Sequence, residues 1–317
     1  MPPVTALAAD TAAPARPITL LVPFPAGGPT DQMARLLAEV LGGRTGQTII
    51  VDNRPGAGGQ IAGAALLHAP ADGRTLLLGE TSVLASNHRL YTKFAYQPER
   101  DFQPITTLMS MPLVLFVPKD SSVNSVKDLV ELGHAEPLNY ASQGAGSLGH
   151  LLAEVFASRT RAPSAPVPNG IQMVHVPYKG SAPAMVALIG TQVDVLFDGL
   201  GAGRPYVLDG RIRALAIAAP QRSPLLPDVP TMAEAGYPGV QASVWYGVVA
   251  RAGTPLPVAE KINKDIVAAL EDPRFSRQFR EQGYRVGGMG IAQFRDYIKS
   301  ESEYWGKVVK DNAISAE

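Results

Sequence analysis

Short apolar runs alternate with amphipathic stretches along most of the chain. Three early runs have the length and the flanking turn residues of buried strands, and they lie at 18–22, 48–52 and 75–78. Between the first two runs, apolar residues recur at a helical spacing, which predicts a helix with its N-cap at Thr30 and its end at Gly42-Gly43. Strand–helix alternation of this kind is typical of a parallel sheet with helices on both faces.

The same alternation starts again after residue 118. Helices are predicted at 125–132, 147–156 and 181–189, the last with Ser181 as its N-cap, and strands at 138–141, 171–176, 193–197 and 212–218. The proline-rich segment 161–169 is interpreted as a surface loop, and the aperiodic segment 220–238 as a linker back to the first set. A strand at 244–250, a helix at 258–270 and a long terminal helix follow.

These two interruptions flank one complete α/β set. We therefore expect two doubly wound α/β domains joined by a two-crossing hinge, with the first domain formed by residues 17–117 plus 240–317 and the second by residues 118–239. Ligands of such paired domains bind at the carboxyl ends of the strands, in the cleft. Residues 1–16 are expected to form a flexible leader, in which Ala6-Leu7-Ala8 is either a chance match or the remnant of a trimmed signal peptide.

Composition narrows the function classes. The chain has 317 residues and no cysteine, and its 28 Lys and Arg residues balance 28 Asp and Glu residues. The lack of cysteine excludes thiol catalysis, Cys-ligated zinc and disulfides. Neutral charge without a basic run argues against a nucleic-acid or anionic-membrane partner. No apolar run approaches the roughly 18 residues of a membrane span.

The loop from Gly144 to Gly149 matches G-x-G-x-x-G between a predicted strand and a predicted helix. A dinucleotide site also needs an acidic residue at the end of the next strand, and here that strand ends in Val176-Pro177-Tyr178. We therefore expect no nucleotide and no other cofactor. The glycines still let backbone amides approach a ligand, and a helix N-terminus favours an anion.

A second glycine-rich loop, from Phe24 to Asp31, lies in the same position between a strand and a helix. Two such loops, one in each domain, would face each other across the cleft and offer free N–H groups to an anion. Four or five hydrogen bonds to a charged group amount to roughly 6–15 kcal/mol, and micromolar binding needs about 8 kcal/mol. The alternative is that each loop is only a tight strand–helix connection.

Ser147 lies in a sequence one residue away from the G-x-S-x-G nucleophile elbow. A hydrolase triad in that order would need a histidine after Asp198, and the last histidine is His175. His150, one turn after Ser147, is interpreted as a capping or packing residue. A serine-dependent hydrolase or a nucleotide-binding enzyme that uses this loop is therefore the alternative hypothesis, and a non-catalytic receptor is preferred.

Asp198 ends a predicted strand, so its carboxylate is expected to point into the cleft and accept a hydrogen bond from a ligand amine or hydroxyl. The alternative roles for this residue are a helix cap or a hinge salt bridge. Thr81 and Ser82 follow the strand at 75–78 and could donate hydroxyls to a ligand, although hydroxyls in a turn more often bond the local backbone.

Several ordered motifs make the chain resemble the Bug/TctC-type solute-binding proteins of tripartite tricarboxylate transporters. They extend from Val22 to Asp31, Val51 to Gly59, Asp72 to Gly73, Tyr140 to Ser147, Val176 to Gly180 and Pro227 to Thr231. The resemblance implies a periplasmic, monomeric protein with a type II periplasmic-binding-protein fold. It would close on a small organic anion and deliver it to the membrane components of the transporter.

The resemblance also assigns candidate binding residues. In the family, the loop corresponding to 24–31 holds one carboxylate, partly through bridging waters, the loop corresponding to 142–147 receives the other end, and the position of Asp198 reads an amine or another variable group. The residues expected to bind the ligand are Phe24, Ala26, Gly27, Gly28, Pro29, Thr30, Asp31, Thr81, Ser82, Ser142, Gly144, Ala145, Gly146, Ser147 and Asp198.

One stretch departs from the family pattern. Many members have Thr-His-x-x-Asn-Pro after the third strand. The corresponding residues of this chain, 83–88, have a different sequence. The departure leaves the contacts of residues 81–86 open and points to a more apolar ligand. Family ligands range from dicarboxylates and amino acids to aromatic acids, so the resemblance does not choose among them. A sensor that reports closure to another protein is a third hypothesis.

Overall fold

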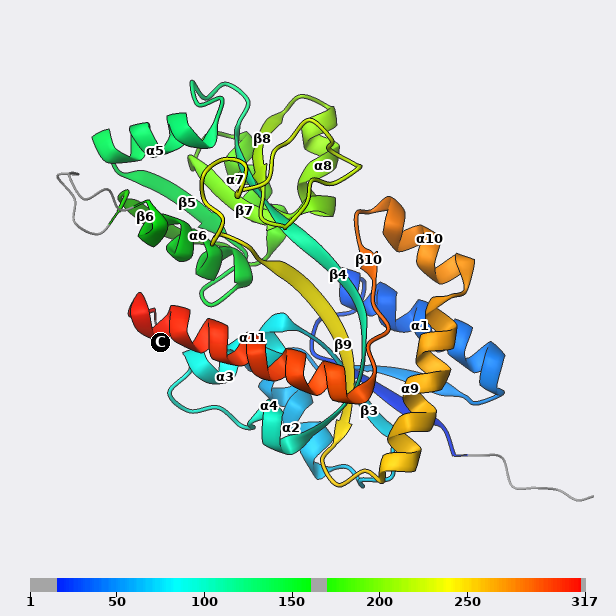
Figure 1. Ribbon diagram of the computed structural model, residues 1–317. Coiled ribbons are helices and arrows are strands. Elements are labelled where there is room, and N and C mark those ends of the chain that lie inside the picture. The colour runs from blue at the N-terminus through cyan, green and yellow to red at the C-terminus, as the bar shows by residue number, and fades with distance from the viewer. Residues whose placement is uncertain (1–15, 161–169, 315–317) are drawn as a thin grey trace, which may run out of the picture.

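The computed structural model describes residues 16–160 and 170–314 of the chain. The strands form two sheets that share the long strand β4 (Phe102–Pro118), and Figure 1 shows them in two lobes connected by β4 and β9 (Ser243–Arg251). Most of the expected leader and all of the expected loop at 161–169 lie outside the described residues. The α/β architecture expected from the sequence is confirmed.

The first sheet has the order β2-β1-β3-β9-β4-β10. Its strands besides β4 and β9 are β1 (Ile18–Val22), β2 (Ile49–Asn53), β3 (Thr75–Glu80) and β10 (Arg285–Val286). Strands β1, β2 and β3 are parallel, but β9 is antiparallel to both of its neighbours. The expectation of a purely parallel sheet is therefore wrong, because the chain re-enters this sheet from the other lobe through β9.

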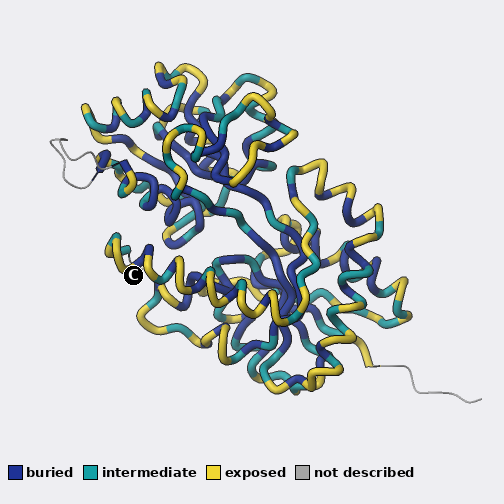
Figure 2. Tube along the Cα trace, in the orientation of Figure 1, coloured by how far each residue is buried: buried dark blue, intermediate teal, exposed yellow. Residues whose placement is uncertain are grey.

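Alternate residues of these strands are buried on opposite faces, as the period of two in a strand requires. Leu20 and Val22 pack in a core with helices α1 (Pro29–Thr45) and α9 (Leu256–Leu270). Leu21 and Leu77 pack in another core with α2 (Gln60–His68) and α11 (Ile291–Asp311). Both faces of the sheet are thus covered by helices, and Figure 2 shows its buried strands in the centre of the lobe.

The second sheet has the order β8-β4-β7-β5-β6. Strands β5 (Leu138–Ser142), β6 (Met173–Pro177) and β7 (Val195–Gly199) are parallel, and β4 is antiparallel to β7 and to β8 (Ile212–Ile217). Helices α5 (Val126–Ala135) and α6 (Leu148–Arg159) contribute to one core of this lobe, and α7 (Ser181–Ile189) and α8 (Leu200–Leu208) to the other.

Strand β4 changes sheet at Pro112-Leu113. Up to Pro112 it pairs with β9, and from Leu113 onward it pairs with β7 and β8. Proline has no N–H to donate to a ladder, which makes Pro112 a natural point for this change. The change lies before residue 118, where the sequence predicts the boundary. The domain limits themselves stay a prediction.

Several predicted helix ends are wrong. The N-cap of α1 is Gly28 rather than Thr30, and the helix continues through Gly42-Gly43 to a left-handed Gly46. Gly180, not Ser181, is the N-cap of α7. The sequence analysis also missed α8, the short helices η1 (Ala57–Gly59), η2 (Ser82–Ser86), α3 (Asn87–Leu90) and α4 (Pro98–Asp101), and α10 (Pro273–Glu281).

Candidate ligand-binding cleft

Two connected cavities lie where the lobes meet. The inner cavity, of about 360 Å³, is lined by the ends of β3 and β7, by β9 and by the first residues of α6 and α8. The outer cavity, of about 700 Å³, is lined by both glycine-rich loops. They share the lining residues Pro29, Glu80, Ser82, Gln143, Ser147, Ser181 and Tyr246. The two therefore form one continuous cleft with walls from both lobes.

The first glycine-rich loop lines the outer cavity with most of the residues that the sequence singled out. These are Phe24, Ala26, Gly28, Pro29 and Thr30. The amides of Gly28 and Thr30 donate no hydrogen bond to another residue in the described part of the chain. They lie at the N-terminus of α1, where the helix dipole favours a negative charge.

Asp31 holds this loop from behind instead of lining the cleft. Its carboxylate accepts hydrogen bonds from the amide of Gly27 at 2.8 Å, from Arg35 at 2.9 Å and from Asn53 at 3.0 Å. The Arg35 guanidinium, with the Gly27 and Asn53 hydrogen bonds, lowers the pKa of Asp31 to about 2. Gly27 and Asp31, both expected to bind the ligand, line neither cavity, and they satisfy each other through this hydrogen bond.

The second glycine-rich loop lines the outer cavity with Gly144, Ala145, Gly146 and Ser147. Three of its amides are already used, because Gly144 donates to Ser142 Oγ at 3.1 Å, Gly146 to His150 Nδ1 at 3.0 Å and Ser147 to the Gly144 carbonyl at 3.1 Å. The free N–H groups expected from this loop are therefore not those of its glycines Gly144 and Gly146. Within the described residues, the amides without such a partner are those of Ala145, Leu148 and Gly149.

Behind this loop lies a stack of aromatic rings. The imidazoles of His150 and His175 stack at 3.9 Å, and Tyr140 stacks on His175 at 4.9 Å. His175 Nε2 lies 2.6 Å from Ser142 Oγ. Ser142, expected to bind the ligand, is fully buried and lines neither cavity, and its hydroxyl supports the loop by accepting from the Gly144 amide.

Burial lowers the pKa of both imidazoles, that of His150 to about 4, with His175 adding to the effect on His150. Neutral His150 can accept the Gly146 hydrogen bond at Nδ1, whereas a protonated ring has only donors. The interpretation of His150 as a packing residue fits this stack, and its position also supports the second loop.

Ser147 is the N-cap of α6, since its hydroxyl accepts from the His150 amide at 3.4 Å. The Nδ1 atom of His150 accepts a hydrogen bond from the Gly146 amide. Among the described residues, no histidine ring nitrogen bonds the Ser147 hydroxyl. A nucleophile–base pair is therefore not formed at Ser147 in this geometry.

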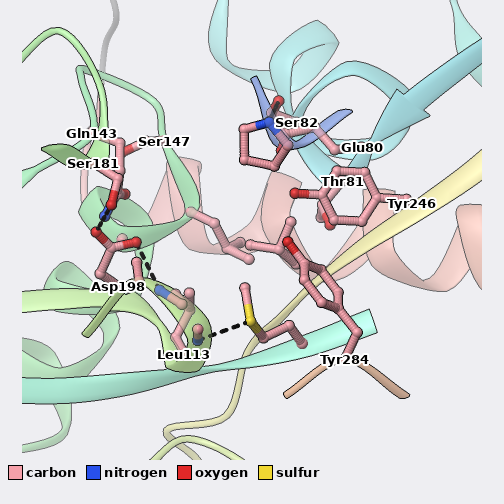
Figure 3. Close-up of a pocket in the computed structure, with 18 of the residues that line it drawn as sticks. Glu80, Thr81, Ser82, Leu113, Gln143, Ser147, Ser181, Asp198, Tyr246 and Tyr284 are labelled. Carbon is pink, nitrogen blue, oxygen red and sulfur yellow. Dashed lines mark hydrogen bonds between the residues drawn. The ribbon is translucent and has the colours of Figure 1, made fainter. Parts of the chain in front are cut away.

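The inner cavity contains two carboxyl groups, one from each lobe. Figure 3 shows Asp198 with Ser181 and Gln143 on one side, and Glu80 with Ser82 and Tyr246 on the other. Asp198 accepts from the Gly199 amide at 2.7 Å and from the Ser181 hydroxyl. Burial raises the pKa of both Asp198 and Glu80.

The two hydroxyl residues after β3 differ in their roles. Thr81 lines the inner cavity, but its buried hydroxyl accepts from the Trp245 amide at 2.9 Å and so joins β3 to β9. Ser82 lines both cavities and donates to Glu80 at 2.6 Å. Thr81 therefore positions the wall of the cleft more than it offers a donor.

Sequence reasoning missed several lining residues, namely Gln32, Glu80, Met111, Leu113, Gln143, Ser181, Tyr246, Gln282 and Tyr284. Glu80 could have been found, because it ends β3 just as Asp198 lies near the end of β7. Gln282 and Tyr284 could not, because they come from a segment far along the chain that carries no motif. No group of three or more potential metal ligands occurs among the described residues, and none of the helices described there could span a membrane.

Two α/β lobes connected by crossing strands, with a cleft lined from both sides, define a protein with a periplasmic-binding-protein-like fold. The family model of the tripartite tricarboxylate transporter family receptor, TctC, matches residues 33–314. The chain therefore belongs to this receptor family, as the resemblance in the sequence indicated.

Individual relatives agree with this assignment. The chain is 39% identical over 308 residues to BugT of Bordetella pertussis, and the match covers 96% of this chain and 91% of BugT. Among solved structures, R. palustris Rpa4515 with adipate superposes with a TM-score of 0.83 at 36% identity, over 96% of this chain and 99% of that one. MatC from Rhodopseudomonas palustris with bound malate superposes with a TM-score of 0.79 at 32% identity, over 93% of this chain and 99% of MatC.

Proposed function

We propose that this protein is an extracytoplasmic receptor that binds a small carboxylate in the cleft and delivers it to the membrane components of a tripartite tricarboxylate-type transporter. The observation that carries the proposal is the convergence of the two glycine-rich loops, one from each lobe, on one cavity. Each loop leads into a helix N-terminus with unpaired amides, and such ends favour anions.

The carboxylate is assigned to the outer cavity. Gly28 and Thr30 would donate from one side and Ala145 from the other, directly or through water. Lys179 also lines this cavity and adds a positive charge. A hydrogen bond to a charged group nets about 1.5–3 kcal/mol, so these donors together with apolar contacts could provide micromolar affinity.

The ligands bound in two solved relatives support the size and class of the solute. One relative was solved with adipate and another with malate, both small carboxylates. A receptor that hands its solute to a membrane transporter must meet it outside the cytoplasm, so we also propose a periplasmic location. We further propose that the protein acts as a monomer, with 17–117 plus 240–317 and 118–239 as its domains.

A role without catalysis is part of the proposal. The Ser142–His175 contact is the one serine–histidine side-chain pair near the cleft among the described residues, and Ser142 has no exposed surface. Ser147, which does reach the cleft, has its hydroxyl at the amide of its own helix. These partners support a structural role for both serines.

The test is a thermal-shift screen of mono- and dicarboxylates, amino acids and aromatic acids, followed by calorimetry on each compound that raises the melting temperature. A ligand at 100 times its Kd should stabilise the native state by about 2.7 kcal/mol. No stabilisation by any compound at millimolar concentration would contradict the proposal. Labelling of Ser147 by a serine-directed phosphonate would favour the hydrolase alternative.

A further inference from the structure

The inner cavity has an unusual charge for a site that receives an anion. Glu80 and Asp198 both line it, and its described lining contains no Lys, Arg or His. The outer cavity shares Glu80 with the inner one, but it also contains Lys179 and the free amides of Gly28, Thr30 and Ala145. The free amides of Leu148 and Gly149 lie at the inner cavity. The one basic side chain of the described cleft lining therefore lies in the outer cavity, Asp198 lies in the inner cavity, and Glu80 reaches both.

The negative charge of Asp198 is already compensated by the protein. Its carboxylate accepts from the Gly199 amide and from the Ser181 hydroxyl. Asp198 also lies beside the N-termini of α7 and α8, whose dipoles stabilise a carboxylate. A ligand group is not needed to satisfy this residue.

Glu80 has no such compensation. Its recorded hydrogen-bond partner within the described chain is the Ser82 hydroxyl at 2.6 Å, and it forms no ion pair there. An ionised carboxylate offers about four acceptor positions, so most of its capacity is open toward the cavity. Burial without a cation destabilises the charged form, which a cationic ligand group would reverse.

Two tyrosines next to Glu80 point to a ligand independently of the acidic residues. Tyr246 and Tyr284 are 6% and 7% exposed, and Figure 3 shows their hydroxyls directed into the cavity. Burial raises the pKa of both hydroxyls, so both stay protonated at neutral pH. Each hydroxyl can donate one proton and accept through its oxygen lone pairs, so both offer hydrogen bonds to a group in the cavity.

We propose that the ligand carries a primary ammonium group at the end opposite its carboxylate, and that Glu80 is the specificity-determining residue that selects it. The inference rests on the proposed function, because the carboxylate end is the one assigned to the glycine loops. A second carboxylate in the inner cavity would instead face two acidic side chains in a low dielectric, which disfavours it. The solute class is thus an ω-amino carboxylate.

Matched ligand pairs test this directly. Replacing one carboxylate of succinate, glutarate or adipate by an aminomethyl group gives γ-aminobutyrate, δ-aminovalerate and ε-aminocaproate. Calorimetry on the full chain at neutral pH should find at least one amino carboxylate bound about tenfold or more tighter than its dicarboxylate partner, as one hydrogen-bonded ion contact provides. The Glu80→Gln variant should lose that preference by a similar factor.

The control variant is Glu260→Gln, which removes an exposed carboxylate of α9 and should leave the preference unchanged. Melting curves of Glu80→Gln without ligand show whether it folds. A second readout is the number of protons released when the ligand binds. Calorimetry at about pH 5, in two buffers of different ionisation enthalpy, measures this number. The parent protein should release protons when it binds the amino carboxylate. Glu80→Gln should release fewer protons, which a purely structural role of Glu80 would not produce.

Two results would overturn the inference. One of them leaves the proposed function intact, and the other refutes it as well. Tighter binding of the dicarboxylates, with the same preference in Glu80→Gln, would refute the ammonium and leave the carboxylate receptor intact. Binding of neither class, with no carboxylate raising the melting temperature, would refute the proposed function and this inference together.

Discussion

The polar residues of the cleft form two groups. Some face the cavity, and others hydrogen-bond to the loops and hold them in place. Gly28 and Thr30 have free amides at the cavity, whereas Gly27 is bonded to Asp31. In the second loop, Ser142 and His150 accept the two glycine amides. The amides of Gly27, Gly144 and Gly146 therefore support the loops. Substitutions that remove their acceptors should lower the stability of the fold more directly than they lower ligand affinity.

The Asp31→Ala substitution tests this support. It leaves the Gly27 amide without its acceptor and removes one of the two acceptors of the Asn53 side-chain amide, which should cost about 1–3 kcal/mol in the free energy of unfolding and weaken ligand binding. The pKa of Asp31 is about 2 in the folded protein and 3.8 in an unperturbed side chain. The contribution of its carboxylate to the free energy of unfolding is therefore present above about pH 4 and is lost as the pH falls toward 2.

Urea unfolding at neutral pH measures the effect of Asp31→Ala. The control is Asp265→Ala, which removes only an exposed ion pair with Lys261 and should cost less than about 1 kcal/mol. Equal losses in the two variants would contradict the assigned role.

Gly28→Val tests the cavity-facing part of the first loop. Gly28 has φ −76° and ψ 172°, and an added Cβ would lie 3.6 Å from Pro25 O, so the fold should accept a side chain. The side chain would occupy the outer cavity and block approach to the amide, so affinity should fall at least about tenfold with little change in melting temperature. Unchanged affinity in calorimetry would remove Gly28 from the site.

Among the elements, the helix N-termini organise the cleft. Helices α1, α6, α7 and α8 all begin at its walls, because each follows directly after a strand that ends there or a loop that lines it. The stacked His150 and His175 connect α6 to β6 behind the second loop. Their neutral form is required for the hydrogen bond from Gly146.

This stack predicts a pH dependence. The folded pKa of His150 is lowered from 6.5 to about 4, so the unfolded chain binds the extra proton between these values, and stability should fall as the pH decreases through that window. In His150→Asn, the Asn Oδ1 can keep the acceptor at the Nδ1 position without titrating. Its melting temperature should decrease less than that of the parent protein between pH 7 and 4.5.

Melting curves over this pH range measure the difference between the two proteins. The neighbouring titratable groups, His175, Tyr140 and Glu154, are present in both, so they cancel in the comparison. Parallel curves would show that His150 does not titrate in this window.

In the molecule as a whole, β4 and β9 connect the lobes, and α11 packs against both. Trp305 and Val308 of α11 join the core of the second lobe, while Phe294 and Ile298 join the first. The sheet change at Pro112-Leu113 makes this part of β4 the expected bending point, since a few residues at an element junction can absorb closure.

Ligand binding should therefore close the cleft. Small-angle scattering of the protein with a ligand found in the thermal-shift screen should give a smaller radius of gyration than without it. The Gly28→Val variant at the same ligand concentration should show no change. An unchanged radius for the saturated parent protein would indicate that α11 and the two strands hold the lobes in one arrangement.

The sequence predicted most elements and misjudged the features that depend on distant contacts. The runs at 18–22 and 212–218 and the helix at 258–270 were recognisable because their apolar spacing is local. Strand β4 was missed because it is buried almost throughout and contains Pro104 and Pro112, so it shows neither alternation nor clear bounding turns. Glu80, Tyr246 and Tyr284 meet only when β3, β9 and the segment after α10 are packed together.

Local spacing and turn chemistry were enough to indicate two α/β units and the loops at the strand ends, because hydrophobic period and glycine positions act over a few residues. The receptor family was indicated separately, by a resemblance of ordered motifs, and the family model shows it. Folding alone decided which amides stay unpaired, that β9 reverses direction, and that two carboxyl groups from opposite lobes share a cavity without a basic side chain. Those features depend on side chains that are far apart in the chain and become neighbours only when the lobes assemble.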